Sequence, residues 1–213
     1  GVQTCALPIF SAGGGVDIVA RAVSQKLTEA LGQQFVVDNR AGAGGVIGTE
    51  IAARAAADGY TVLFGTSSGM VINPLLSSRL PYHPERDFAP VGMVAINPTI
   101  LVVHASIPVS TVKELVAHLK ARPDQLNYST SGAGGLGHLA GELFNTLAGV
   151  KAQHVPFKGG APSVQALVAG QVQLAFVPPI NVIQLIKAGK LRAVAISGKS
   201  RLPSLPEIGR AHV

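Results

Sequence analysis

The residues best placed to do chemistry lie in one glycine- and hydroxyl-rich segment, residues 127–138, which reads NYSTSGAGGLGH. A short β-prone run opens this segment, and apolar residues at helical spacing follow it. A strand, a tight turn and a helix start together aim unpaired backbone N–H groups and a partial positive charge at one point. Such a point binds an anion, usually a phosphate or a carboxylate. We therefore expect Ser131, Gly132, Gly134 and Gly135 to contact an anionic ligand.

A second segment repeats this arrangement near the start of the chain. Ser11, Gly13, Gly14 and Gly15 precede a helical pattern that runs through residues 16–31. Two anion-binding turns on two α/β units indicate two lobes that close on one small anionic ligand. The alternative is that both are ordinary turns between a strand and a helix, where glycine is common.

A third polar turn, residues 65–69 (GTSSG), follows a predicted strand at residues 61–64. Ligands of open α/β sheets gather at the carboxyl ends of strands, so Thr66 and Ser67 are candidate contacts. The turn also matches the G-x-S-x-G elbow of serine hydrolases, which needs a helix directly after it. Pro74 disfavours such a helix, so the sequence argues against a hydrolase.

Gly132, Gly134 and Gly137 match the dinucleotide fingerprint G-x-G-x-x-G between a strand and a helix. That fingerprint also requires an acidic residue about 20 positions further on, which holds the ribose. Residues 152–154 are Ala-Gln-His, and no acidic residue follows before residue 207. The glycine spacing keeps a nucleotide- or NAD-dependent enzyme that uses this loop as the alternative to a binding protein. The missing acidic residue argues against that alternative.

Two further side chains lie next to the predicted turns. His138 is in the first helical turn after the glycine loop, where it either donates to a ligand carboxylate or braces the loop. Lys158 follows a predicted strand end and either pairs with an anion or lies on the surface. The histidines do not have the spacing of metal ligands, so we expect neither a metal nor a cofactor.

Composition bounds the class of protein. The 213 residues allow one or two domains, and 47% hydrophobic residues with only 13% charged residues indicate a globular chain with a large core. No apolar run reaches the roughly 18 residues of a membrane helix. The net charge is +6, and no acidic residue lies between Leu143 and Pro206, which favours anionic ligands. The cations are scattered and aromatic residues are scarce, so we expect no nucleic acid partner.

Both ends of the chain look foreign. Residues 4–9 can be encoded by DNA whose reverse complement lies inside a coding of residues 207–213. We therefore predict that residues 1–9 and 207–213 are not native, and we leave them out of the predicted fold. We further expect the natural protein to extend past both ends, and the only cysteine, Cys5, to say nothing about redox compartment.

Strands and helices alternate along the rest of the chain, which predicts an α/β fold with a mostly parallel sheet in each half. We expect residues 10–97 to form the N-terminal part of lobe 1, residues 98–196 to form lobe 2, and residues 197–206 to return to lobe 1. Two crossings between the lobes would make them a hinged pair.

Several segments, in order, resemble the Bug-type solute receptors of tripartite tricarboxylate transporters. They are residues 10–21 (FSAGGGVDIVAR), 38–48 (DNRAGAGGVIG), 58–61 (DGYT), 127–129 (NYS), 137–144 (GHLAGELF) and 154–159 (HVPFKG). The resemblance covers residues 10–206, and ordered motifs of this length are far more specific than a single glycine loop.

The resemblance implies a type II-like periplasmic-binding-protein fold with two lobes, incomplete here at both ends, and no catalysis. It implies a monomeric periplasmic receptor that captures a small mono-, di- or tricarboxylate between its lobes and delivers it to a membrane permease. In the family, backbone N–H groups, hydroxyls and waters hold the carboxylate. The corresponding residues here are 11–15, Thr66, Ser67, 131–135, and the loop with Pro156, Phe157 and Lys158.

Three departures from the family pattern bear on the ligand and the fold. Phe157 stands where the family often has Tyr, which removes a hydroxyl. Val177 and Pro178 stand where many members carry Asp and Asn, which removes a contact for amino-bearing ligands. The family's chain also continues past Pro206, so we expect uncovered apolar surface in lobe 1.

Overall fold

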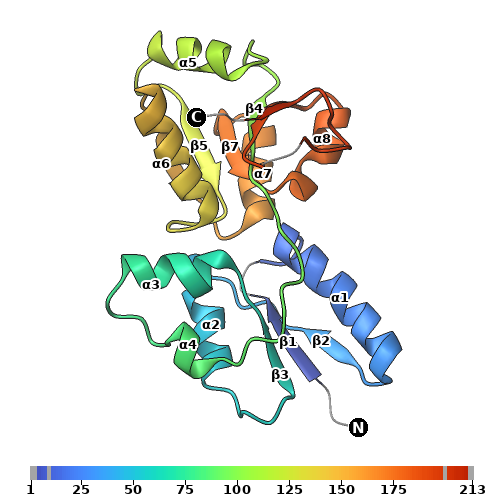
Figure 1. The fold of residues 1–213 in the computed structure, drawn as a ribbon. Helices are drawn as coiled ribbons and strands as arrows, with labels where there is room; N and C mark the ends of the chain where they lie inside the picture. Colours follow the sequence, from blue (N-terminus) through green and yellow to red (C-terminus); the bar gives the residue numbers. More distant parts are fainter. Residues whose placement is uncertain (1–3, 9–10, 199–200, 211–213) are drawn as a thin grey trace. The chain divides into compact units, whose positions relative to one another are not determined.

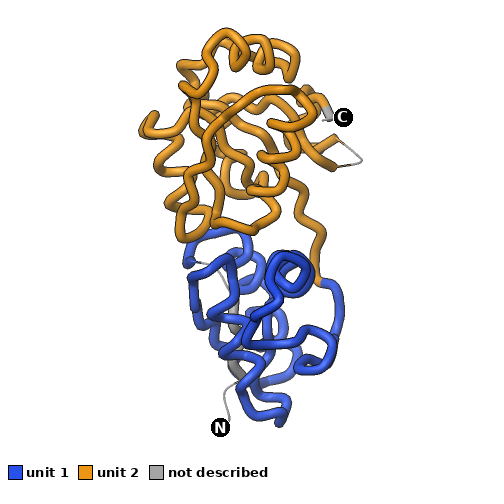
Figure 2. Tube along the Cα trace, turned by 90° about the vertical axis from the view of Figure 1, so that its left-hand side faces the viewer, with its two compact units in different colours: residues 1–93 blue, residues 94–213 orange. Residues whose placement is uncertain are grey.

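The computed structural model describes residues 4–8, 11–198 and 201–210, and it shows the alternating strands and helices of an α/β protein (Figure 1). The chain divides into two compact units, residues 1–93 and residues 94–213 (Figure 2). Each unit has its own β-sheet, so each is described by itself. No helix in the described part of the chain is long and apolar enough to cross a membrane.

Unit 1 is built on a three-stranded parallel sheet with the order β2-β1-β3. The strands are β1 (Thr4–Pro8), β2 (Phe35–Val37) and β3 (Thr61–Phe64), and β1 pairs with both of the others. The predicted strand at residues 61–64 is confirmed. The predicted fold leaves out residues 1–9. In the structure β1 lies between the other two strands, so the predicted fold lacks the central strand of this sheet.

Helices α1 (Gly15–Leu31) and α2 (Val46–Ala53) connect these strands. The chain moves from β1 to β2 in one direction and from β2 to β3 in the other. Right-handed crossovers therefore place the two helices on opposite faces of the sheet. The carboxyl ends of β1 and β3 are neighbours at the point where this direction reverses, and ligands of α/β sheets bind at such points.

Residues 68–87 contain more helix than the sequence predicts. A π-helix at Ser68–Ile72 leads into α3 (Asn73–Leu76), and α4 (Pro84–Asp87) follows. The expectation that Pro74 prevents a helix here is wrong, because Pro74 lies in the first turn of α3, where a missing N–H is tolerated. The Asn73 side chain donates to Gly44 O at 3.1 Å, which ties this segment to the glycine turn η1 (Ala43–Gly45).

Few of the side chains whose burial is described in unit 1 are part of a core. Among its described side chains, Ala20 and Tyr82 are the only apolar ones that are fully buried. Strands β2 and β3 contain no fully buried residue, and Ile18, Ile47 and Ile51 are 40%, 44% and 40% exposed. The uncovered apolar surface expected for the first lobe is therefore present in unit 1.

Unit 2 is built on a six-stranded sheet with the order β6-β5-β7-β4-β8-β9. The strands are β4 (Ile100–His104), β5 (Asn127–Thr130), β6 (Gln153–Pro156), β7 (Leu174–Val177), β8 (Leu191–Ile196) and β9 (Gly209–Arg210). Strand β4 is antiparallel to both neighbours, and the other pairs are parallel. The carboxyl ends of β5, β6 and β7 therefore lie at one edge of the sheet, which we call the loop edge.

Helices cover both faces of this sheet. Helices α5 (Val112–Lys120) and α6 (Leu136–Ala148) lie on one face, and α7 (Gly160–Val168) and α8 (Ile183–Lys187) lie on the other (Figure 1). At the start of α5, the Thr111 hydroxyl accepts from the Glu114 N–H at 3.2 Å, and the Glu114 carboxylate accepts from the Thr111 N–H at 3.2 Å. This is the capping box that the sequence predicts.

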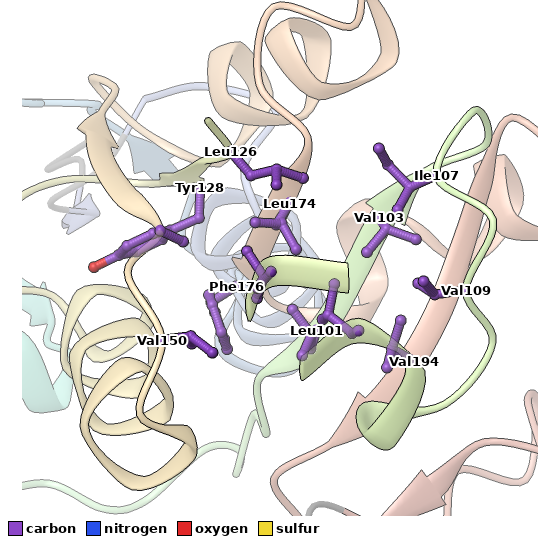
Figure 3. Close-up of a cluster of buried hydrophobic side chains, with 13 residues drawn as sticks. Leu101, Val103, Ile107, Val109, Leu126, Tyr128, Val150, Leu174, Phe176 and Val194 are labelled. Carbon is purple, nitrogen blue, oxygen red and sulfur yellow. The ribbon is translucent and has the colours of Figure 1, made fainter. Parts of the chain in front are cut away.

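Strand β4 contributes to two cores at once. Leu101 and Val103 point into the cluster that packs against α5 and α6, together with Phe176 (Figure 3). Ile100 and Val102 belong to the cluster that packs against α7 and α8. An unbroken apolar run is what a strand needs when both of its faces are buried.

Two boundaries differ from the expected ones. The units divide between Met93 and Val94, a few residues before the expected boundary at residue 97. The described residues of 197–210 group with unit 2 rather than with the first lobe. The reason is local bonding and burial: the Thr99 N–H donates to Ser197 Oγ at 3.0 Å, the Ser197 N–H donates to Thr99 O at 2.9 Å, and Ile208 is buried in the second cluster.

Candidate functional site

Asp17 holds the first glycine loop in place. Its carboxylate accepts from the Gly13 N–H at 2.9 Å, from Arg21 at 3.0 Å and from Asn39 at 3.0 Å, and the residue is 3% exposed. Burial acts to raise the pKa of Asp17, but the hydrogen bonds from Arg21, Gly13 and Asn39 outweigh it and keep the pKa below its ordinary value. Asp17 is therefore a cap that braces the loop, as its place near a helix start indicates.

The same loop presents polar groups that the protein itself does not use. In the described part of the chain, the N–H groups of Gly15 and Val16 in the first turn of α1 have no acceptor. The buried Oγ of Ser11 also has no hydrogen-bond partner there. The positive end of a helix 17 residues long points at this loop. Together these groups can bind an anion.

The loop after β3 starts beside the loop after β1, because Phe64 pairs with Pro8 at the ends of these strands. Thr66 shapes this turn, since its Oγ1 accepts from the Gly69 N–H at 3.5 Å. Ser67 is exposed. Within the described residues, neither hydroxyl is hydrogen-bonded to a histidine.

The glycine loop after β5 in unit 2 is held from two sides. The buried Thr130 hydroxyl donates to Gly132 O at 3.1 Å, and the Gly132 N–H donates back to the same hydroxyl oxygen at 3.3 Å. On the other side, the Gly134 N–H donates to Nδ1 of His138 at 3.2 Å. Gly134 has a φ of 73°, which favours glycine. His138 therefore braces the loop, which is one of the two roles expected for it.

The start of α6 lies directly against β7. A Cβ added to Gly137 would collide with the backbone oxygen of Phe176, so this close approach requires glycine. The N–H groups of Leu136 and Gly137, in the first turn, have no acceptor in the part of the chain that the structure describes. The positive end of α6 is therefore directed at the loop edge.

A stack of rings supports this loop from within unit 2. The ring of His154 lies 4.1 Å from that of His138 and 5.0 Å from that of Tyr128, measured between centroids. Nε2 of His154 lies 2.7 Å from Thr130 Oγ1, and it acts as the donor because the Thr130 proton goes to the loop. Burial, and then His138, lower the pKa of His154 to about 4, against a smaller raising effect of Glu142. His154 is therefore neutral near pH 7.

The loop after β6 leads into α7 at the same edge. The Phe157 N–H donates to Thr130 O at 3.0 Å, and its ring packs against the second cluster, so Phe157 contributes shape. Pro156 and Lys158 are exposed, and Lys158 forms no ion pair within the described residues. The N–H of Gly160, the first residue of α7, likewise has no acceptor there. This loop can therefore offer both amides and a cation to an anion.

One polar side chain at the loop edge was not predicted from the sequence. Asn181 ends η3 (Pro179–Asn181), which follows β7, and both polar atoms of its side chain are buried without a hydrogen-bond partner. An asparagine after two prolines has the composition of an ordinary turn, so no local signal marks it. Its significance is visible only once its burial and its missing partners are known.

Within the described residues these groups are hydrogen-bond donors and one cation, which suit the binding of an anion. Within the described residues, no group of three or more His, Cys, Asp or Glu side chains could hold a metal ion. Residues 152–154, on and before β6, carry no carboxylate to hold a ribose. Gly137, the third glycine of the fingerprint, is accounted for by helix packing. The loop therefore lacks the acidic half of a dinucleotide site.

Comparison with known proteins decides the family. The family model described as tripartite tricarboxylate transporter family receptor matches residues 19–212. The chain belongs to this family. It is 40% identical over 199 residues to the UPF0065 protein in the tcbD-tcbE intergenic region of Pseudomonas sp. strain P51, and 37% identical over 207 residues to protein BugT of Bordetella pertussis. The resemblance to Bug-type receptors is confirmed.

These alignments cover 93% and 94% of this chain but 59% and 64% of the two relatives, so the chain spans less than two thirds of their length.

Solved structures share the fold of this family member. Rpa4515 of R. palustris with adipate has a TM-score of 0.95 and 37% identity, covering 98% of this chain and 70% of that one. MatC of Rhodopseudomonas palustris with bound malate has a TM-score of 0.91 and 31% identity, covering 99% and 72%. The predicted periplasmic-binding-protein fold is confirmed.

Proposed function

We propose that this chain is the ligand-binding part of a periplasmic receptor that captures a small organic carboxylate and delivers it to a tripartite tricarboxylate-type permease. The observation that carries the proposal is shared by α1, α6 and α7. Each begins behind a glycine loop with backbone N–H groups that no described residue uses. Family membership supports it, as do the related structures that hold adipate or malate.

The carboxylate is bound mainly by amides in this proposal. A hydrogen bond to a charged group contributes about 1.5–3 kcal/mol, so two or three such amides suffice for useful affinity. The candidate contacts in unit 1 are Ser11, Gly13, Gly14, Gly15, Thr66 and Ser67. The candidate contacts in unit 2 are Ser131, Gly132, Gly134, Gly135, His138, Pro156, Phe157 and Lys158.

The proposed receptor acts as a monomer without a cofactor and performs no reaction, so its task is selective capture and release. The expectation that loops of both units hold one ligand stays a prediction from the sequence. A variant in each unit tests it, because one shared ligand would be lost in either case.

The proposal is tested by following thermal unfolding of the chain with malate, succinate, adipate and citrate, and separately with NAD and ATP. A ligand at 100 times its Kd adds about 2.7 kcal/mol to the free energy of unfolding, so binding raises Tm. We expect at least one carboxylate to raise Tm and neither nucleotide to do so. Stabilisation by NAD or ATP alone would support the nucleotide-dependent enzyme instead, and no response to any compound would refute both.

A further inference from the structure

Asn181 has a buried amide that the protein leaves unpaired. Its Oδ1 and Nδ2 each expose less than 1 Å², and neither has a hydrogen-bond partner among the described residues. Leaving a buried polar group unpaired costs about 1–3 kcal/mol, so such a group calls for an explanation. By contrast, the side chain of Asn145 is fully used, since it donates to Ala152 O at 2.9 Å and accepts from the Ala152 N–H at 3.1 Å.

The place of Asn181 in the sheet puts it among the candidate ligand loops of unit 2. Strands β5, β6 and β7 are parallel, so the segment after Val177 leaves the sheet at the same edge as residues 131–135 and 157–159. The 3₁₀ turn that ends at Asn181 lies against α7, whose first turn is at that edge.

The residues before Asn181 offer few backbone donors, which leaves its side chain as the main polar group of this segment. Pro178 and Pro179 have no backbone N–H. The Asn181 N–H is already used, because it donates to Pro178 O at 3.1 Å. The N–H of Ile180 has no acceptor among the described residues, so a ligand at the end of β7 meets the Asn181 side-chain amide and one backbone donor.

We propose that Asn181 is a specificity-determining residue that reads a hydroxyl group on the carboxylate ligand, so that hydroxycarboxylates are preferred over their deoxy analogues. The inference rests on the proposed function and deepens it. An amide offers one donor side and one acceptor, and a carboxylate can satisfy only the donor. A hydroxyl both donates and accepts, so it satisfies both, and it is small enough for a closely packed position.

Burial makes this contact selective. The amide is shielded from bulk water. Hydrogen bonds are electrostatically stronger inside a protein than in water. A site built to pair with a hydroxyl discriminates against an analogue without it, because the amide is then left unpaired. A ligand hydroxyl at this position removes an existing cost, whereas a deoxy ligand leaves that cost in place.

The test measures Kd by calorimetry for matched pairs: malate and succinate, lactate and propionate, and citrate and tricarballylate. We expect the unmodified chain to bind the hydroxylated member of the pair it recognises about tenfold more tightly. In Asn181→Leu this preference is lost, while affinity for the deoxy member changes little. Asn181→Asp, which keeps the size and adds a negative charge, weakens both members.

Thermal unfolding without ligand separates this role from a structural one. Asn181→Leu is expected to keep or raise Tm, because it removes an unpaired buried amide. Asn145→Leu is the control, and it is expected to lower Tm and leave the hydroxyl preference unchanged. Equal binding of both members by the unmodified chain, or a preference retained in Asn181→Leu, overturns the inference while the carboxylate receptor stands. No binding of any carboxylate overturns both.

Discussion

At the scale of single residues, two substitutions of Gly134 test separately how side-chain size and negative charge affect carboxylate binding. It has a φ of 73° in the loop after β5, a conformation that Asn and Asp tolerate better than other side chains. Gly134→Asp is expected to lower carboxylate affinity by at least about tenfold, because it places a negative charge at the anion site. Gly134→Asn adds a side chain of the same shape without charge, and it should retain most of the affinity. Calorimetric titration with the best carboxylate measures both.

Equal affinities for Gly134→Asp and Gly134→Asn would remove this loop from the site. The corresponding change in unit 1 is Gly14→Asp, at the residue that precedes the first turn of α1. Loss of the same single binding event in Gly14→Asp and Gly134→Asp supports a ligand shared by the two units. Loss in only one variant would confine the ligand to one unit.

His154 makes stability depend on pH. Its pKa is about 4 in the folded chain and about 6.5 when unfolded, so the unfolded state binds more protons between these values. The free energy of unfolding should therefore fall as pH drops from 6.5 towards 4, by roughly 1–3 kcal/mol from this residue. His154→Gln keeps a donor for Thr130 without this titration, and its stability should fall less over that window. Thermal melts at a series of pH values measure the difference.

The control for this experiment is His83→Gln, which changes an exposed histidine of unit 1. It leaves the contact between His154 and Thr130 in place, so the loss of stability assigned to His154 should persist. An identical pH dependence in His154→Gln would show that His154 does not titrate differently in the two states.

The sequence predicts these residues unevenly. Residues 11–15 and 131–135 were predicted because glycine and hydroxyl residues between a strand and a helix have a local signature. The support beneath them was not predictable, since Thr130, His138 and His154 come together only when β5 and β6 pair. Asn181 was not predicted for the same reason. Whether its side-chain amide has a hydrogen-bond partner depends on which residues the fold brings next to it.

At the scale of elements, α6 packs on the sheet through a glycine face. A Cβ added to Gly141 would collide with the ring of Tyr128, which is fully buried. Alanine gains about 1 kcal/mol over glycine in a helix, but overpacking a tight core costs about 1–3 kcal/mol. Gly141→Ala is therefore expected to destabilise the chain, which denaturant unfolding measures.

A second change shows whether lack of space is the reason. Replacing Tyr128 by Leu makes room beside Gly141, so the alanine should be less harmful in the double variant than alone. Additive losses in the double variant, or a stability gain in Gly141→Ala, would contradict this account of the packing.

Helices with strong termini were the most predictable elements. Gly32 ends α1 with a φ of 67°, and Thr111 with Glu114 starts α5, both as the sequence indicates. The direction of β4 was not predictable, because the apolar run at Ile100–His104 reads alike in either orientation. Helix α3 was not predicted because a proline disfavours a helix interior, whereas Pro74 occupies the first turn.

At the scale of the whole molecule, the described side chains of the two units differ in how many are buried. The described apolar side chains that are fully buried in unit 1 are Ala20 and Tyr82, whereas unit 2 contains two buried clusters. We expect amide hydrogens of β2 and β3 to exchange at least about tenfold faster than those of β4 and β7. Hydrogen exchange with mass spectrometry measures this, and equal protection in both units would contradict it.

The length comparison gives a second form of this experiment. The chain covers 59% and 64% of the length of two relatives. That further residues cover the exposed apolar surface of unit 1 is a prediction from the sequence. A version extended to the length of those relatives should slow exchange in β2 and β3 and leave β4 unchanged. Unchanged exchange in β2 and β3 would mean that the added residues fold elsewhere.

The unused N–H groups at the starts of α1, α6 and α7 have a consequence for the conditions in which the receptor works. Peptide amides neither gain nor lose protons in water at ordinary acidity, unlike histidine or lysine. Their capacity to donate hydrogen bonds to a bound anion therefore does not change as the solution acidifies. Any weakening of binding in acid would then come from protonation of the carboxylate ligand, from ionisable side chains of the site or from unfolding, and not from these amides.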